Sequence, residues 1–390
     1  MSGGQVIGLG CRLNIAESER IAALIGHRSD RVVINSCAVT AEAVRHTRRT
    51  IRRARRAHPH ARLFVTGCAA ETERAALSAM PEVDEVVPNA TKLLAASYGI
   101  KSAAAARAPA RTRAFVAVQN GCDHACTFCI IPRGRGASRS QTIDAVLDEI
   151  AAQHDRGAAE IVLTGVDVTA WGADLPGQPR LGSLVDAILA KFPRLARLRL
   201  SSLDGAEIDP LLFDLIASEQ RVMPHLHLSL QHGHDLILKR MKRRHSRAQA
   251  AALVAALRAR RPDIAIGADL IAGFPTETAE HHAANLSLVR ELGIVHGHVF
   301  SFSARHDTPA ARMPQVADAT IRTRASELRA AIADVRYAWQ CALIGQPLSV
   351  LAEKDGRGYA ENYARVATPA VPAGTVCTIT PTMCEDDLLR

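Results

Sequence analysis

Three cysteines lie close together in the segment "GCDHACTFC", separated by three residues and then by two. They are Cys122, Cys126 and Cys129. Thiolates at such spacings bind iron–sulfur clusters, and a cubane cluster normally takes four of them. Zinc would need a second pair of Cys or His ligands near His124, and the sequence offers none at that spacing. Three thiolates can hold three irons of a cubane, so we expect a cluster with one open iron.

A second set of cysteines is spread along the N-terminal part of the chain. Cys11, Cys37 and Cys68 each follow directly on an apolar run, in "VIGLGC", "VVINSC" and "LFVTGC". If these runs are parallel strands, they end at one edge of the sheet, where the three thiols can converge. The alternative is three unrelated buried cysteines that act as small hydrophobic side chains. We expect that ordinary buried role for the cysteines outside any ligand spacing, which are Cys341, Cys377 and Cys384.

The N-terminal elements that would position this second set are short strands and helices in alternation. Apolar runs at residues 5–10, 31–36 and 62–67 are separated by helical patterns rich in Ala, Arg and Glu. This order predicts a small doubly wound α/β domain over residues 1–98. Residues 99–112 contain Pro109 and no periodic apolar face, which predicts a linker.

From residue 113 the alternation continues with longer units, up to residue 345. Six strand–helix units at intervals of about 30–45 residues predict a partial (β/α)6 barrel, with its chemistry at the C-terminal ends of the strands. The expected strands are Phe115–Gln119, Glu160–Gly165, Arg197–Ser201, His225–Leu230, Ile264–Ile271 and His296–Phe302. A helical stretch at 316–343 ends the pattern. Short runs with Gly and Pro turns then predict a small β module over residues 346–390.

The chain carries a formal net charge of +9, concentrated in the runs "RHTRRTIRRARR" (45–56) and "KRMKRRHSR" (239–247). One interpretation is two solvated basic faces, and the other is contact with a polyanion, above all a nucleic acid. The candidate RNA-binding residues are Arg48, Arg49, Arg52, Arg53, Lys242, Arg243 and Arg244. No apolar run approaches the roughly 20 residues of a membrane span, and the N-terminus is a poor secretory signal, so we expect a cytoplasmic protein without a membrane partner.

The motif of Cys122, Cys126 and Cys129 on the first loop of a βα barrel resembles the radical S-adenosylmethionine superfamily. The longer segment "NGCDHACTFCIIPRGRGASRS" (120–140) is similar to the most specific stretch of one family within it, the methylthiotransferases. Phe128, the aromatic residue before the last cysteine, also fits. The resemblance implies that the open iron binds S-adenosylmethionine. Electron transfer from the cluster then cleaves this cofactor to a 5′-deoxyadenosyl radical, so the hard chemistry belongs to the cofactor.

The segments "GCRLNIAESE", "INSCAVT" and "VTGCAAE" are similar to the three cysteine motifs of the methylthiotransferase family. That family joins an auxiliary-cluster domain, a radical core and a TRAM-like RNA-binding β module, in the order expected here. The resemblance therefore implies two [4Fe-4S] clusters and S-adenosylmethionine as cofactors. The implied metal ligands are Cys11, Cys37, Cys68, Cys122, Cys126 and Cys129.

Other stretches, among them "EIVLTGVDVTAWG" and "HVFSFSARHDTPAARMP", resemble the branch that methylthiolates C2 of N6-threonylcarbamoyladenosine next to the anticodon of tRNA. The alternatives are isopentenyladenosine in tRNA, a ribosomal protein, or a non-catalytic RNA-binding or redox-sensing role. Besides tRNA, the resemblance implies an electron donor such as flavodoxin or ferredoxin, while the sulfur donor stays unspecified. C2 carries no leaving group and is not acidic, so we expect no catalytic acid–base residue.

Topology and resemblance together suggest which residues shape the cofactor pocket. They lie at or just after the C-terminal ends of the expected barrel strands, where chemistry gathers. They are Gly165, Asp167, Ser201, Ser202, Gln231 and Gly273. Arg135 and Arg139 have two open interpretations, as supports of the cluster loop or as phosphate contacts.

Overall fold

The computed structural model describes residues 5–26, 28, 30–100 and 111–390. The chain divides into two compact units. The first comprises residues 1–109, 119–139 and 303–308, and the second comprises 110–118, 140–302 and 309–390. Most of the expected linker, residues 99–112, falls on 101–110, which lie outside the described residues.

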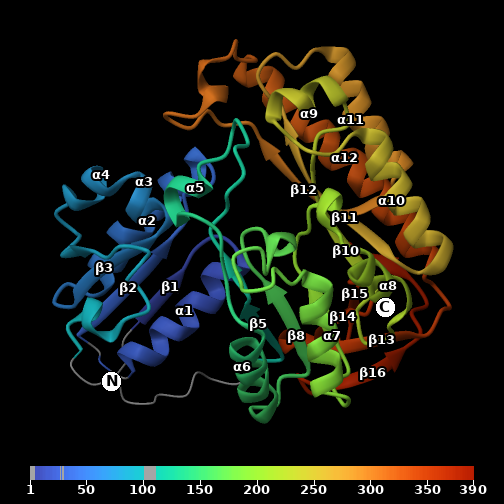
Figure 1. Ribbon diagram of the computed structural model, residues 1–390, viewed down its shortest axis with the longest axis horizontal. Coiled ribbons are helices and arrows are strands. Elements are labelled where there is room, and N and C mark those ends of the chain that lie inside the picture. Colours follow the sequence, from blue (N-terminus) through green and yellow to red (C-terminus); the bar gives the residue numbers. More distant parts are fainter. Residues whose placement is uncertain (1–4, 27, 29, 101–110) are drawn as a thin grey trace. The chain divides into compact units, whose positions relative to one another are not determined.

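The first unit is built on a parallel sheet whose strands follow chain order, β1-β2-β3-β4. The strands are β1 (Gln5–Gly8), β2 (Arg31–Ser36), β3 (Arg62–Gly67) and β4 (Glu85–Val86). The helical elements are α1 (Arg12–Ile25), α2 (Ala41–Ala57), α3 (Cys68–Thr72), α4 (Arg74–Ser78), η1 (Ala95–Tyr98) and α5 (Ile131–Arg135). Figure 1 shows α1 and α2 covering opposite faces of this sheet.

Alternation along the strands explains the two covered faces. In β2, Val32 and Ile34 pack in one apolar cluster with Val44 and Ile51 of α2. Val33 lies on the other face, in the cluster that contains Ile21 and Ile25 of α1. Because successive strand residues point to opposite faces, one apolar run supplies both cores. The expected doubly wound α/β domain is confirmed.

The second unit contains, among its described residues, six parallel strands in two sheets of three, β5-β8-β9 and β10-β11-β12. The strands are β5 (Arg113–Ala117), β8 (Glu160–Thr164), β9 (Leu198–Leu200), β10 (His225–Gln231), β11 (Ala265–Ala272) and β12 (Ile294–Ser301). A parallel bridge between Leu203 and Leu228 joins the two sheets. The order is that of a partial (β/α)6 barrel, as expected.

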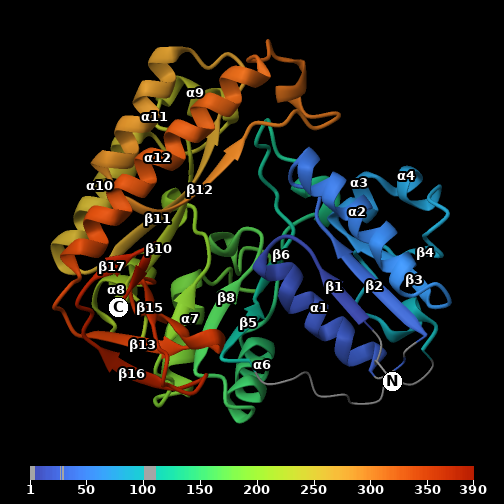
Figure 2. The same ribbon diagram turned by 180° about the vertical axis from the view of Figure 1, so that it is seen from behind.

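Helices cover the outer face of these strands, and the main core lies between the two layers. Leu226, Leu228, Ile266 and Ala268 share one apolar cluster with Ile332 and other helix residues. The helices are α6 (Ile143–Asp155), α7 (Leu181–Lys191), α8 (Pro210–Ser218), α9 (Asp235–Met241), α10 (Arg247–Arg260), α11 (Ala279–Glu291) and α12 (Asp318–Ala342), with short turns η2 (Val168–Ala170), η3 (Gly205–Glu207) and η4 (Pro309–Arg312). Figure 2 shows α12 alongside β12, against which it packs.

The C-terminal residues of the second unit form a separate sheet with the strand order β16-β13-β14-β15-β18-β17. Its elements are β13 (Leu348–Ala352), η5 (Lys354–Gly356), β14 (Arg357–Ala360), β15 (Arg365–Ala367), β16 (Val376–Ile379), β17 (Cys384–Glu385) and β18 (Leu388–Leu389). Val350, Ala360 and Val366 are buried in its own small core. The expected β module is therefore present.

A buried charge cluster ties this module to the barrel strands. Glu160 of β8 accepts hydrogen bonds from Arg199 (3.0 Å) and from Arg197 (3.0 Å). Arg197 also donates to the Ser349 carbonyl at 3.1 Å, and Arg199 to the Glu361 carbonyl at 3.2 Å. Burial alone would raise the pKa of Glu160, but Arg199 and the other arginines hold it at about 2. The module is thus fixed to the strands by charged groups that are themselves out of water.

Among the residues that the structure describes, no helix combines the length and the apolar character that crossing a bilayer requires.

Candidate iron–sulfur and cofactor site

Cys11, Cys37 and Cys68 lie where the parallel strands β1, β2 and β3 end. Cys11 is the N-cap of α1, Cys37 follows β2, and Cys68 is the first residue of α3. Gly10 has φ of +95°, and a Cβ at this position would lie 2.9 Å from the Sγ of Cys37. The glycine therefore lets the first cysteine loop come close to the second cysteine.

The thiols of this set influence one another. Burial raises the pKa of the Cys37 thiol, and the thiols of Cys68 and Cys11 raise it further. Like charges that share one site resist ionisation, so three thiolates here call for a cationic partner. A cluster of irons is such a partner, and the edge location matches the expected convergence.

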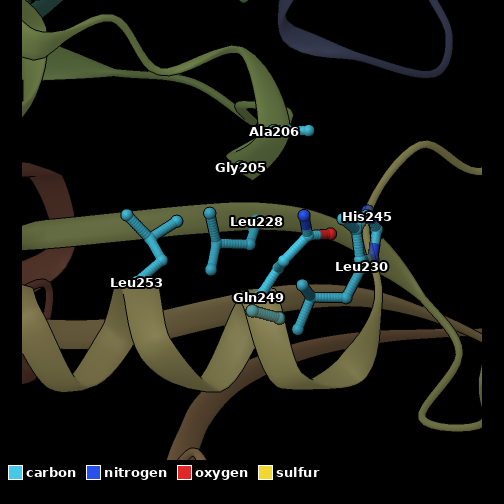
Figure 3. A pocket seen from close by; sticks show the side chains of 8 residues that line it. Gly205, Ala206, Leu228, Leu230, His245, Gln249 and Leu253 are labelled. Atoms are coloured by element: carbon cyan, nitrogen blue, oxygen red, sulfur yellow. The ribbon is translucent and has the colours of Figure 1, made fainter.

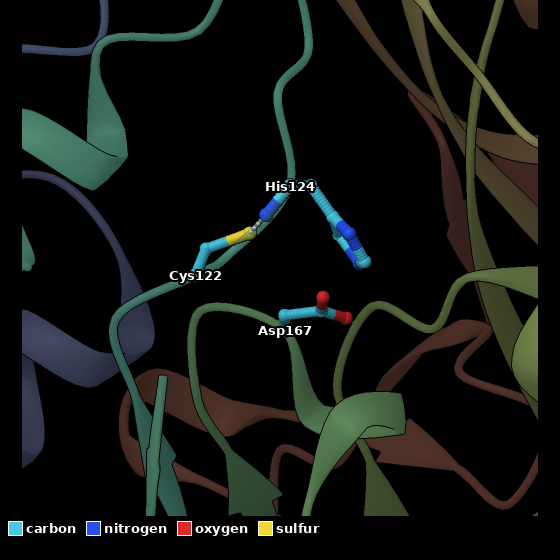
Figure 4. A group of neighbouring side chains, drawn as sticks. All are labelled: Cys122, His124 and Asp167. Carbon is cyan, nitrogen blue, oxygen red and sulfur yellow. Dashed lines mark hydrogen bonds between the residues drawn. The ribbon is translucent and has the colours of Figure 1, made fainter. Parts of the chain in front are cut away.

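The loop with Cys122, Cys126 and Cys129 belongs to the same unit of the chain. It turns tightly: the Cys122 N–H donates to the Gly136 carbonyl at 3.1 Å, and the Cys129 N–H donates to the Cys126 carbonyl at 3.1 Å. The His124 N–H donates to the Cys122 Sγ at 3.4 Å, which Figure 4 shows as a dashed line. The Ile131 N–H donates to the Cys129 Sγ at 3.4 Å. Such N–H groups stabilise thiolates and tune the clusters that they bind.

Arg135 follows this loop, at the end of α5, and its side chain is only 2% exposed. It donates to the Glu17 carboxylate at 2.9 and 3.1 Å, to Asn120 Oδ1 at 2.9 Å and to Asn14 Oδ1. Its Nε also donates to the Cys68 Sγ at 3.3 Å. The structure therefore favours the support role among the two interpretations of Arg135.

The same Glu17 carboxylate also accepts from Lys92 Nζ at 2.6 Å, and both side chains are nearly inaccessible to water. Burial would raise the pKa of Glu17, but Arg135 and Lys92 outweigh it and lower the pKa. Arg139, in contrast, is exposed and donates to the Arg135 carbonyl at 3.4 Å. Sequence reasoning did not find Glu17, because nothing local pairs it with an arginine 118 residues away.

The expected cofactor-pocket residues all lie at strand ends in the second unit. Gly165 follows β8, Ser201 and Ser202 follow β9, Gln231 ends β10 and Gly273 follows β11, while Asp167 is the N-cap of η2. Gln231 and Gly273 adopt left-handed conformations, with φ of +70° and +73°. The chain therefore turns sharply at the ends of β10 and β11, the edge of a parallel barrel where chemistry gathers.

Glu277 organises the loop after β11 and was not singled out from the sequence. Its buried carboxylate accepts from the Gly273 N–H at 2.9 Å and from Arg324 at 3.0 Å. It also lies 3.3 Å from His232 Nε2. The signal in the sequence is the "GFPTE" run itself, which ends in an acidic residue that can bond back to the glycine N–H.

Histidines line the inner face of the barrel strands, and the sequence analysis did not single out this group. The His227 and His298 rings lie 3.2 Å and 3.0 Å from Asp269 Oδ1. Their ligand atoms and that of Asp269 all lie within 4.8 Å of one another, so they could hold a metal or a polar ligand group. A Cβ on Gly297 would meet Ile332 of α12, which places the neighbouring His298 on the opposite, inner face. The signal is the alternation in "HLH" and "HGH".

The candidate RNA-binding residues divide by their contacts. Arg48, Arg49 and Arg52 of α2 form ion pairs with Glu73, Glu42 and Glu82, while their side chains stay 38%, 65% and 55% exposed. Arg53 is also exposed.

In the second run, Lys242 is exposed, and Arg244 is 40% exposed while paired with Asp204 and Glu207. The Arg243 side chain is only 7% exposed and donates to Asp204 and to the Ser229 carbonyl. These contacts favour a structural role for Arg243.

The expectation that the cysteines outside the two sets are ordinary buried side chains is wrong for Cys341, which is exposed. Cys377 is half-buried, and its thiol donates to the Val350 carbonyl.

A pocket between β10, α10 and η3 has about 30 Å³ of space and is lined mainly by apolar side chains (Figure 3). This volume suits about one water molecule, so the pocket is no cofactor site.

Two known family models match this chain, one over the barrel strands and one over the N-terminal sheet. The model of the radical SAM superfamily matches residues 116–289, and that of uncharacterized protein family UPF0004 matches residues 5–88. Among solved structures, the radical S-adenosylmethionine methyltransferase TsrM from Kitasatospora setae matches with a TM-score of 0.58 and 15% identity, over 79% of this chain and 74% of that one. This likeness confirms the fold.

Curated relatives match almost the whole chain. The threonylcarbamoyladenosine tRNA methylthiotransferase MtaB from Rickettsia prowazekii is 43% identical, over 93% of this chain and 90% of the relative. The MtaB of Bacillus subtilis is 31% identical, over 92% and 88%. The tRNA-2-methylthio-N(6)-dimethylallyladenosine synthase of Cereibacter sphaeroides is 34% identical, over 89% and 86%. The chain therefore belongs to the methylthiotransferase family of radical S-adenosylmethionine enzymes.

Proposed function

We propose that this enzyme methylthiolates C2 of N6-threonylcarbamoyladenosine next to the anticodon of tRNA. The observation that carries the proposal is the presence of two three-cysteine sets at loop and strand ends, in a chain 43% identical to a threonylcarbamoyladenosine tRNA methylthiotransferase. The alternative nucleoside is dimethylallyladenosine, another name for isopentenyladenosine, and relatives named for it are 34% identical to this chain. A ribosomal protein substrate gains no support from the relatives compared, whose names refer to tRNA.

Within this proposal each cysteine set holds one [4Fe-4S] cluster. Cys122, Cys126 and Cys129 bind the cluster that also takes S-adenosylmethionine, and the Cys11, Cys37 and Cys68 set binds the auxiliary cluster. The fit is chemical: each set offers three soft thiolates, and backbone N–H groups or Arg135 point at their sulfurs. When bound, these cofactors supply the radical chemistry that an unreactive C–H bond requires.

The chain's own residues bind and orient. The strand-end residues Gly165, Asp167, Ser201, Ser202, Gln231 and Gly273 remain our candidates for the cofactor pocket. Glu277 fixes the Gly273 turn through two backbone N–H groups, those of Gly273 (2.9 Å) and Phe274 (3.2 Å). The inner-face group of His227, Asp269 and His298 supplies polar atoms that suit a threonylcarbamoyl adduct better than an apolar dimethylallyl adduct.

The domain roles and the partners complete the proposal. Residues 1–98 form the auxiliary-cluster domain, 113–345 the radical core and 346–390 a TRAM-like RNA-binding module. The exposed arginines of α2 together with Lys242 and Arg244 would contact tRNA phosphates. A flavodoxin or ferredoxin would deliver electrons, the sulfur donor is left unspecified, and a tRNA substrate favours the cytoplasm.

Iron content and nucleoside analysis test the proposal. After anaerobic reconstitution with iron and sulfide we expect about eight irons per chain, four for each cubane. The Cys11/Cys37/Cys68 triple alanine variant should retain about four irons and still cleave S-adenosylmethionine under a reductant. Equal iron in this variant and in the unaltered chain would refute the auxiliary cluster.

The substrate is tested by mass spectrometry of tRNA nucleosides from a deletion strain. We expect the methylthio form of threonylcarbamoyladenosine to disappear and its precursor to accumulate, while the methylthio form of dimethylallyladenosine stays. Loss of the latter instead would establish the alternative substrate.

A further inference from the structure

Arg135 connects the two cysteine sets within one unit of the chain. It follows Cys129 by six residues, and the Gly136 carbonyl next to it accepts from the Cys122 N–H. At the other end, its guanidinium donates from Nε to the Cys68 Sγ at 3.3 Å. Arg135, which follows the loop of Cys122, Cys126 and Cys129 (the radical-cluster loop), thus places a permanent positive charge against the Cys68 thiol of the other set.

The surroundings keep that charge in place and out of water. Glu17 receives two of the guanidinium hydrogen bonds, and Lys92 Nζ lies 2.6 Å from the same carboxylate. The side chains of Arg135, Glu17 and Lys92 are 2%, 4% and 2% exposed. Two buried cations face one buried anion, so one positive charge is in excess beside Cys68.

A charge of this kind has a defined effect on an iron–sulfur cluster. The reduced cluster carries one more negative charge than the oxidised cluster, and hydrogen bonds to its sulfurs are among the factors that set its reduction potential. Low water access strengthens the effect, because a buried charge is screened less than an exposed one. A cation on a ligand sulfur therefore stabilises the reduced state.

We propose that Arg135 is a positioning residue that raises the reduction potential of the auxiliary cluster through the Cys68 sulfur, with Glu17 limiting the size of the effect. The inference rests on the proposed function, since it takes Cys11, Cys37 and Cys68 as the ligands of that cluster. It assigns to the radical-cluster loop a second task besides holding its own cluster.

The test uses the full-length chain with Cys122, Cys126 and Cys129 replaced by alanine, so that one cluster remains. This cluster is reconstituted anaerobically and titrated with a reductant, and its reduction is followed by electron paramagnetic resonance. Arg135→Gln should lower the reduction potential, and Glu17→Gln should raise it. A tenfold change in the one-electron equilibrium corresponds to about 59 mV, and we expect at least that shift in Arg135→Gln.

Two further variants separate charge from architecture. Arg135→Lys keeps the cation and should shift the potential less than Arg135→Gln does. Arg139→Gln removes an exposed cation of the same loop and should leave the potential unchanged. Opposite shifts in the Arg135 and Glu17 variants support the inference, because a merely loosened fold would not invert its effect with the sign of the charge.

Contrary outcomes are also distinct. A full iron load with an unchanged potential in Arg135→Gln overturns the inference and leaves the proposed function intact. If Arg135→Gln takes up no iron, Arg135→Lys and Glu17→Gln decide, and shifts of both in the same direction overturn it. Absence of iron from the parent with Cys11, Cys37 and Cys68 intact would instead overturn the auxiliary-cluster assignment itself.

Discussion

At the scale of single residues, three of the candidate ligand cysteines depend on the glycine that directly precedes them. Gly10, Gly67 and Gly121 have φ of +95°, +91° and +77°, and each directly precedes a candidate ligand. A Cβ at Gly67 would lie 2.5 Å from the Ser36 nitrogen, and at Gly121 it would collide with the Ala137 carbonyl oxygen. Since these obstacles are backbone atoms, they cannot move aside as a flexible side chain can.

Alanine at either glycine should therefore displace the cysteine that follows. We expect Gly67→Ala to lose the four irons of the auxiliary cluster, and Gly121→Ala to lose those of the cluster that binds S-adenosylmethionine. Iron analysis and visible absorbance after reconstitution measure both losses.

Gly157→Ala is the matched control for these variants. Gly157 also has a positive φ, +84°, but a Cβ there would meet nothing within 4 Å. The Gly157→Ala substitution should lower the free energy of unfolding by about 1–2 kcal/mol, because alanine disfavours a left-handed backbone. It should leave the iron content unchanged. Equal iron loss in all three variants would mean that backbone strain, and not the close approach, disturbs the cysteines.

At the scale of the elements, the inner face of β10, β11 and β12 makes a prediction about substrate choice. His298 Nδ1 lies 3.0 Å from Asp269 Oδ1, which orients the ring and leaves Nε2 for a ligand, while the side chain is 63% exposed. A hydrogen bond from this nitrogen would favour a ligand that carries polar groups over an apolar one.

His298→Phe should accordingly reduce kcat/KM for a threonylcarbamoyladenosine stem-loop by about 10–100-fold, equivalent to the loss of one or two hydrogen bonds. Activity is measured by mass spectrometry of the product nucleoside, with a dimethylallyladenosine stem-loop in parallel. His154→Phe, an exposed histidine of α6, serves as the control. Equal activity of wild type and His298→Phe on the polar substrate would exclude this histidine from recognition.

Elements were predictable where the information is local. The expected runs 31–36 and 62–67 coincide with β2 and β3, because a short run of apolar and β-branched residues specifies a buried strand. The convergence of Cys11, Cys37 and Cys68 followed from parallel topology alone. In contrast, the Arg135–Glu17 contact and the role of Glu277 arise from packing between distant segments, and no period within one element encodes them.

Glu160 gives an element-scale prediction about stability. Its carboxylate compensates Arg197 and Arg199, whose side chains are 3% and 1% exposed. Glu160→Gln leaves these cations buried without a counter-charge, and removing one partner of a buried ion pair costs about 3–5 kcal/mol. Chemical denaturation of the apoprotein at neutral pH measures this loss. Asp214→Asn breaks the exposed pair with Arg260 and should cost no more than about 1 kcal/mol.

The same carboxylate predicts a pH dependence. The pKa of Glu160 is held at about 2, below its ordinary value of 4.5, so its ionised form stabilises the folded state. This contribution is fully present above the ordinary value and is lost as the pH falls toward 2. The stability gap between wild type and Glu160→Gln should therefore be constant from pH 7 to 5 and narrow below. A gap that widens in acid would contradict the assignment.

For the molecule as a whole, the net charge of +9 predicts a polyanionic partner, and the structure distinguishes the basic residues that serve the fold from those that are exposed. Part of the basic excess serves the fold: Arg55 donates to the Glu82 and Ala61 carbonyls, and Arg243 is buried against Asp204. The exposed positions on α2, which include Arg49, Arg52 and Arg53, are our candidates for contact with a polyanion. Association with tRNA through such positions releases counterions, so it must weaken as salt rises.

The triple variant Arg49→Ala, Arg52→Ala and Arg53→Ala tests this. We expect weaker tRNA binding at low salt, and a slope of log Kd against log salt that falls by about one for each phosphate that an arginine no longer neutralises. Iron content should not change, because these side chains point to solvent. The double variant Arg194→Ala and Arg260→Ala removes exposed charge from α7–β9 and α10 and should keep the slope. If the triple variant and the double variant both keep the slope of the unaltered chain, the tRNA interface lies away from α2.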